Sequence, residues 1–145
     1  MNTLLSALDN EKNSTIMNLD YKTIKKMKND ILQQLQIKGE DLKKMHEKLK
    51  NYRYIDTIDN LNIGGYVRWI NLKKLEKQEG EIDFKKILTN GAIICDWKIL
   101  DNGIHIVCKT NQHRIIQLNF DENLLFQKLT EQEEILLSVI KYLNN

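Results

Sequence analysis

The stretch GAIICDWKILDNGIHIVCKTNQHRIIQLNF, residues 91–120, decides the fold. It contains three runs rich in Ile, Val and Trp, as β-strands prefer, with two short polar connections between them. We therefore predict three antiparallel strands joined by two tight turns. The sequence determines the layout of this meander more closely than that of any other segment.

The spacing of apolar residues predicts the register of the first hairpin. A two-residue turn at Asn102-Gly103 places Ile99 opposite Ile106. The same register places Trp97 opposite Cys108, so that the four side chains share one apolar face. We expect this face, including Trp97, to be buried.

A three-residue loop, 111–113, is predicted to lead into the third strand. It pairs Thr110 with Arg114 and continues the apolar face by setting Ile106 against Leu118. The opposite face keeps a smaller apolar cluster among polar side chains. That cluster consists of Ile94, Val107 and Ile115, and such clusters are usually covered by a helix or a partner.

Residues 19–52 follow a helical spacing close to a heptad repeat. Seven of the nine seam positions are apolar, and the exceptions are Lys28 and Lys38. The apolar positions, which we predict to form the interface of a homo-oligomer, are Ile24, Ile31, Leu35, Leu42, Met45, Leu49 and Tyr52. We predict one long coiled-coil-like helix; the alternative is two helices that fold back as a hairpin at Lys38-Gly39, since glycine weakens a helix.

The remaining segments complete an α+β fold. Residues 54–58 and 66–72 have the composition of short strands, and a capping box at Thr130 and Glu133 begins a helix over residues 131–143. We predict a small antiparallel sheet or partly open barrel of four to five strands, with the C-terminal helix packed on it. Residues 1–52 would form the oligomerisation segment, and residues 53–145 the β domain.

Charge and hydropathy limit the possible partners. The net charge is +2, with +3 on residues 1–52 and −1 on residues 53–145, which is low for a general polyanion-binding protein. No apolar run is long enough to span a membrane, and the first residues lack the features of a secretory signal. We expect Cys95 and Cys108 to be buried free thiols in a reducing compartment, the cytoplasm.

No residue pattern indicates an enzyme. The soft metal ligands are three histidines and two cysteines, without the spacing of a zinc site. No serine lies in a nucleophile elbow, and Gly64-Gly65 lacks the Lys and Ser or Thr of a phosphate-binding loop. We therefore expect no catalytic residue, no cofactor and no metal.

The sequence favours a non-enzymatic interaction protein that presents its β module to a protein partner. The alternative is a single-stranded nucleic-acid binder, because aromatic and basic residues on short strands stack bases and contact phosphates. The candidate surface for either partner consists of Tyr66, Arg68, Lys98, Val107, Lys109 and Ile115.

Three short motifs carry a resemblance to known proteins. They are Tyr54-Ile55-Asp56-Thr57, Gly64-Gly65-Tyr66-Val67-Arg68-Trp69-Ile70 and Asn90-Gly91-Ala92-Ile93-Ile94. With them, residues 52–143 resemble small uncharacterised proteins of large double-stranded DNA viruses of eukaryotes. The resemblance implies a viral source and a cytoplasmic or virion context, and it assigns no activity to any residue.

Overall fold

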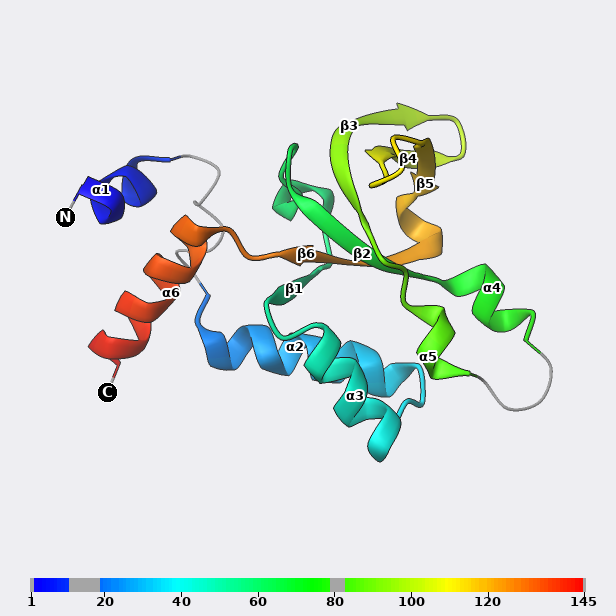
Figure 1. The fold of residues 1–145 in the computed structure, drawn as a ribbon, viewed down its shortest axis with the longest axis horizontal. Coiled ribbons are helices and arrows are strands. Elements are labelled where there is room, and N and C mark those ends of the chain that lie inside the picture. The colour runs from blue at the N-terminus through cyan, green and yellow to red at the C-terminus, as the bar shows by residue number, and fades with distance from the viewer. Residues whose placement is uncertain (1, 11–18, 79–82, 145) are drawn as a thin grey trace.

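A computed structural model describes residues 2–10, 19–78 and 83–144 of the chain. Six antiparallel strands form one sheet in the order β1-β6-β2-β3-β4-β5 (Figure 1). The strands are β1 (Tyr52–Ile55), β2 (Tyr66–Asn71), β3 (Ala92–Leu100), β4 (Gly103–Lys109), β5 (Ile115–Asn119) and β6 (Asn123–Lys128). The helices are α1 (Asn2–Asp9), α2 (Tyr21–Gln34), α3 (Glu40–Lys48), α4 (Leu72–Glu76), α5 (Phe84–Ile87) and α6 (Glu131–Leu143), with single 3₁₀ turns η3 (Ile58–Asn60) and η4 (Phe120–Glu122).

The α+β class and a C-terminal helix are confirmed, but the long coiled-coil-like helix is wrong. The C-terminal helix was also predicted to pack on the sheet, whereas α6 packs against α1 and against Ile24 of α2. α2 ends at Gln34 and α3 begins at Glu40. Between them the backbone turns through left-handed conformations at Gln36, with φ 63°, and at Gly39, with φ 65°. A continuous helix is impossible through such residues. The structure has two helices that break at Gly39, as in the alternative.

The apolar seam of residues 19–52 packs on the chain's own sheet. Met45 and Leu49 are buried beside Phe126 and Ile70, and Ile31, Leu35, Leu42 and Tyr52 pack around them. Ile24 lies in a separate cluster with Leu136 and Leu137 of α6. The seven residues predicted to form an oligomer interface therefore lie within or against the core of a single chain.

Lys28 is a charged residue of the seam, and a hydrogen bond offsets the cost of burying it. Its ammonium donates a 2.9 Å hydrogen bond to the carbonyl of Leu49, the residue that ends α3. A cation is favourable there because the carbonyl end of a helix is electronegative. Burial nevertheless lowers the pKa of Lys28, and nearby Lys25 lowers it further. The bond fastens α2 to the end of α3.

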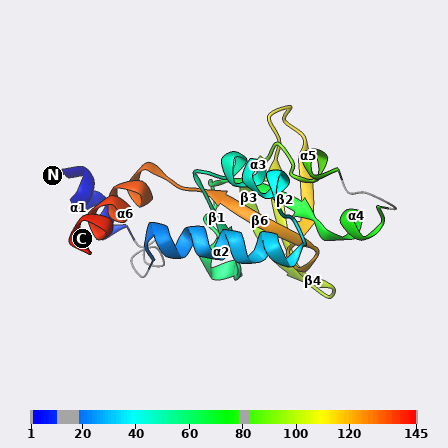
Figure 2. The same ribbon diagram turned by 90° about the horizontal axis from the view of Figure 1, so that it is seen from below.

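The predicted count of four to five strands is wrong, since no strand was predicted at residues 123–128, which form β6. β6 lies between β1 and β2, and five of its six residues are buried. On one face, Leu125 joins the core formed with Ile55 and Trp69. On the other face, Leu124 and Phe126 pack against α2 and α3, which lie along the sheet (Figure 2). A strand covered on both faces has no polar–apolar alternation to reveal it.

The meander exists, and its second hairpin has the predicted register. Thr110 donates its backbone N–H to the carbonyl of Arg114 at 2.9 Å, and Ile106 pairs with Leu118. The first hairpin differs, since its turn occupies residues 101–102 and Ile99 pairs with Ile104. This shift of two residues leaves Ile99 on the predicted face.

A β-bulge in β3 makes a larger difference, because it changes which residues of β3 face the core. Ile94 pairs with Cys108 and Asp96 pairs with Val107, so Cys95 is an extra residue. The bulge exchanges the two faces of β3 on its N-terminal side. Ile94, which was predicted to face outward, is therefore buried, and Ile93 is exposed instead.

Gly91 lies where the chain enters β3 against β2. Its φ is +106°, and a Cβ atom there would lie 2.5 Å from the carbonyl oxygen of Val67 and 2.7 Å from the ring of Tyr66. Gly64 has a similar φ of +88° but no heavy atom within 4 Å of such a Cβ. Glycine is thus required at residue 91 both by conformation and by close packing.

This difference predicts unequal costs for two alanine substitutions. Gly64→Ala is expected to lower the free energy of unfolding by about 1 kcal/mol, the cost of a left-handed residue with a Cβ. Gly91→Ala should lower it by about 1–3 kcal/mol more, because the Cβ also collides with backbone. Urea denaturation followed by circular dichroism measures both. Equal losses would mean that β3 accommodates the additional atom.

Candidate functional site

The outer face of the meander is the face of β3–β5 opposite the core, and it holds the candidate site. Its first row crosses four strands, because Tyr66 pairs with Ile93, Ile93 with Lys109, and Lys109 with Ile115. Directly paired residues point to the same side of a sheet. The two further rows are Asp96, Val107 and Gln117, and then Lys98, His105 and Asn119.

The helices of the described residues leave this part of the sheet uncovered. On β6 and β2, the side of the sheet that continues the outer face packs against α2 and α3. Phe126 and Ile70 lie on this side. On β3 and β5, Ile93 is 46% exposed and Ile115 is 64% exposed. One face of the sheet therefore changes from helix-covered core to open surface at the boundary between β2 and β3.

Five of the six predicted surface residues meet on the outer face. Tyr66, Lys109 and Ile115 belong to its first row, and Val107 and Lys98 belong to the second and third rows. Because Lys98 and Lys109 are exposed and Asp96 lies between their rows, positive charge on this face is modest.

Arg68 is the one predicted surface residue that does not lie on the outer face, and its guanidinium binds backbone carbonyls of the same chain. Its Nε donates to the carbonyl of Thr89 at 2.8 Å, and its Nη1 donates to the carbonyl of Lys48 at 3.3 Å. Its partner in the sheet is Phe126, beneath the helices. The guanidinium therefore links β2 to the end of α3 and to the segment before β3.

Sequence reasoning missed two apolar parts of the surface. Ile93 was missed because the bulge that exposes it has no sequence signature. Trp97, predicted to be buried, faces the core side but is 39% exposed, and Ile99 beside the turn is 72% exposed. The β3–β4 hairpin therefore carries exposed apolar side chains to its tip, where Leu100 is 40% exposed on the outer face.

His105 holds part of the outer face in place. Although it lies on the outer face, it is 8% exposed. Its Nε2 is 2.8 Å from the Oδ1 of Asn102, and its Nδ1 is 3.0 Å from the Nε2 of Gln117. With the carboxamides oriented in this way, Nε2 donates to the Asn102 oxygen and Nδ1 accepts from the Gln117 nitrogen. This arrangement links the β3–β4 turn to β5.

The two cysteines occupy contrasting environments. Both are free thiols, but Cys95 at the bulge is exposed, whereas Cys108 is buried as predicted. Burial raises the pKa of the Cys108 thiol to about 12, and Cys95 adds to the shift. Because the thiolate is the reactive form, Cys108 is chemically inert in the folded protein.

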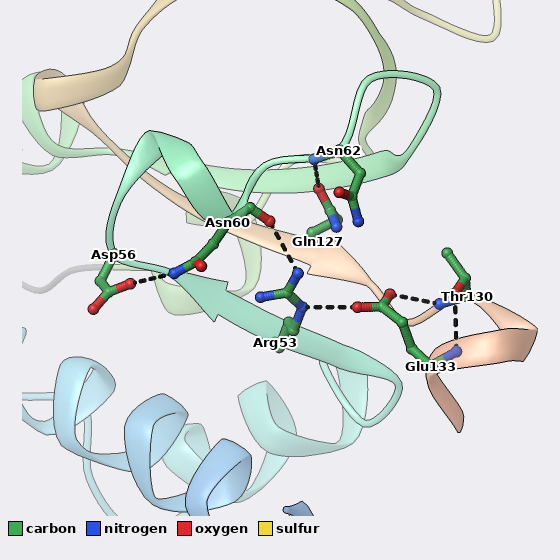
Figure 3. Close-up of polar contacts among 7 residues, drawn as sticks. All are labelled: Arg53, Asp56, Asn60, Asn62, Gln127, Thr130 and Glu133. Carbon is green, nitrogen blue, oxygen red and sulfur yellow. Dashed lines mark hydrogen bonds and ion pairs between the residues drawn. The ribbon is translucent and has the colours of Figure 1, made fainter. Parts of the chain in front are cut away.

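A cluster of buried polar groups lies away from the outer face, at the junction of β1, β6 and α6 (Figure 3). The Nε of Arg53 is 3.3 Å from the Oε2 of Glu133, and these side chains are 4% and 0% exposed. Neither atom makes a hydrogen bond among the described residues, so the contact is an ion pair. Arg53 also donates from Nη2 to the carbonyl of Asn60 at 2.9 Å.

The same cluster contains the predicted capping box of α6. Glu133 accepts the backbone N–H of Thr130 at 3.0 Å, and Thr130 Oγ1 accepts the backbone N–H of Glu133 at 3.1 Å. Gln127, fully buried, accepts the N–H of Asn62 at 2.8 Å, while its Nε2 has no partner among the described residues. These contacts make the cluster a structural joint between sheet and helix.

Comparison with protein families, curated proteins and solved structures finds no match for this chain. The resemblance to proteins of large DNA viruses therefore stays a prediction. Within residues 2–10, 19–78 and 83–144, no three His, Cys, Asp or Glu side chains lie close enough to hold a metal ion. None of the helices described is long and apolar enough to cross a membrane.

The buried ion pair predicts a large effect of a small substitution. Glu133→Gln should lower the free energy of unfolding by about 3–5 kcal/mol, because it leaves the Arg53 charge buried without a counterion. The control is Glu131→Gln, an exposed residue in the same helical turn, which should lose about 0.3–1 kcal/mol. Chemical denaturation of both variants measures the difference.

A double-mutant cycle tests the coupling itself. Arg53→Met combined with Glu133→Gln should recover much of the loss, because the double variant has no unpaired buried charge. Simple addition of the two single losses would show that the groups act independently.

The cysteines predict two separate labelling rates. A thiol reagent at neutral pH should modify one thiol of the native protein rapidly, at Cys95, and the second only as the protein unfolds. Cys95→Ser should then show no rapid phase, whereas Cys108→Ala should retain it. Rapid labelling of two thiols in folded protein would contradict the burial of Cys108.

Proposed function

We propose that this protein is a non-enzymatic interaction protein that presents the outer face of its meander to a protein partner. One observation carries the proposal. Ten large apolar side chains are exposed among the described residues, and half of them lie on two strands of the meander. These five are Ile93, Trp97, Ile99, Leu100 and Ile115. Ile93, Leu100 and Ile115 lie on the outer face, whereas Trp97 and Ile99 lie on the core side of the same hairpin.

Their arrangement is typical of a contact surface. Ile93 and Ile115 flank Lys109 in one row, with Val107 in the next, so apolar area alternates with charge. Protein interfaces combine apolar anchors with a polar rim in this way. Most of the face rests on three regularly paired strands, and a rigid support of this kind reduces the entropy lost on binding.

Single-stranded nucleic acid is the weaker candidate partner. The exposed aromatic ring of Trp97 and the exposed cation of Lys98 favour it, because such groups bind bases and phosphates. The two side chains, however, lie on opposite faces of β3. Against it, Arg68 is bound to carbonyl groups of the same chain, which leaves Lys98 and Lys109 as the exposed cations among the predicted surface residues.

The proposal predicts that one outer-face substitution weakens partner binding. Ile93→Glu places a charge in the first row and should weaken binding at least tenfold, as expected for an apolar anchor. Ile63→Glu is the matched control, since Ile63 is 47% exposed but lies outside the meander. Partners are captured with the tagged full-length protein, purified, and titrated with wild type and both variants by calorimetry.

The two candidate partners give different results. Equal binding of a purified partner by Ile93→Glu and Ile63→Glu would overturn the proposal. In parallel, a labelled single-stranded oligonucleotide is titrated at several salt concentrations. Tight binding that falls steeply with salt and is weakened by Lys109→Ala would favour nucleic acid instead.

A further inference from the structure

The sheet ends in β5, a strand whose outer edge is not paired with any other strand of the described residues. Of the two terminal strands, β1 packs beneath α2 and is followed by η3, whose Asn60 carbonyl binds Arg53. In the described part of the chain, only β4 packs extensively along β5. The two edges of the sheet are therefore protected very unequally.

β5 also lacks the features that usually prevent pairing between edge strands. Residues 115–120, IIQLNF, contain no charge, proline or glycine, and β5 pairs with β4 over five residues without a bulge. Proteins normally place lysine, proline or a bulge on an exposed edge to prevent association. The unguarded edge is a surface suited to another strand.

We infer that β5 pairs with β5 of a second copy of this chain, antiparallel and around a twofold axis at Gln117. In that arrangement Gln117 faces Gln117 of the second copy. Ile116 faces Leu118 of the second copy on the core side, and Ile115 faces Asn119 on the outer side. The apolar core row thereby continues from one chain into the other.

Charges at the two ends of β5 favour the antiparallel orientation. Arg114 precedes the strand and Asp121 follows it, and both are exposed. Antiparallel pairing brings the beginning of one strand to the end of the other, so each Arg114 approaches an Asp121. A twofold contact also closes on itself, because each chain has one free β5 edge and the dimer uses both.

The dimer would unite the two outer faces. In a twofold pair of edge strands, the same face of both sheets points to the same side. The two copies would thus present two outer faces on one continuous sheet, an arrangement suited to bivalent binding. The inference does not depend on the proposed partner binding, since it concerns the edge of β5.

Charge reversal at the twofold position tests the geometry directly. Gln117→Lys and Gln117→Glu both lose the contact of Gln117 Nε2 with His105, but Gln117 is exposed, so both should fold. Each variant alone places like charges opposite each other and should dimerise roughly fivefold more weakly than wild type. An equimolar mixture should form heterodimers at about the wild-type level, because opposite charges then face each other. Gln33→Lys and Gln33→Glu, on the exposed side of α2, are the controls and should dimerise like wild type.

Sedimentation velocity over a concentration series reads out the result with the full-length chain. A pairing of five residues is at the small, transient end of protein interfaces, so the dimer fraction should rise with concentration. Circular dichroism confirms that each variant is folded. A wild type that stays monomeric throughout the series would overturn the inference. So would dimerisation unchanged in both Gln117 variants, or a mixture that dimerises no better than its components.

Discussion

The whole sheet depends on β6, which is the last strand in the sequence and a central strand in space. β1 and β2 are each hydrogen-bonded to β6 and not to each other. Side chains of β6 alternate between two cores, with Leu125 on one side and Leu124 and Phe126 on the other. Neither core is complete until this strand is inserted. The fold is therefore built on contacts between residues far apart in sequence, which is typical of slow-folding topologies.

The ion pair of Arg53 and Glu133 extends this dependence to α6. Burying two charges costs solvation energy that their attraction offsets only in part, so the pair contributes little net stability over an apolar contact. Each charge, however, is tolerated in the interior only beside its partner. Together with the capping box, the pair thus determines where β6 ends and where α6 begins. The sequence indicated the capping box, because its spacing is local, but not the ion pair, whose members are 80 positions apart.

Sequence prediction succeeded where residues close in sequence determine the structure, and it failed where contacts between distant residues do. The second hairpin of the meander was predicted in its true register because apolar alternation and loop length agree there. The helix break at Gly39 was kept only as an alternative, since an apolar seam indicates one buried face but not whether the helix continues. β6 was missed because burial on both sides removes alternation. In each failure, tertiary contacts decided between local structures that the sequence allows almost equally.

The candidate surface depends on one extra residue. Without the bulge at Cys95, strict alternation along β3 would bury Ile93 and expose Ile94, as the sequence alone suggests. With the bulge, Ile93 joins Tyr66, Lys109 and Ile115 in one row on the face that the helices leave open. The bulge also separates two parts of β3. The first residues of the strand pair with β2, and its last residues extend to an exposed hairpin tip. The residues of the outer face could therefore be largely named from sequence, whereas their arrangement required the irregular backbone at residue 95.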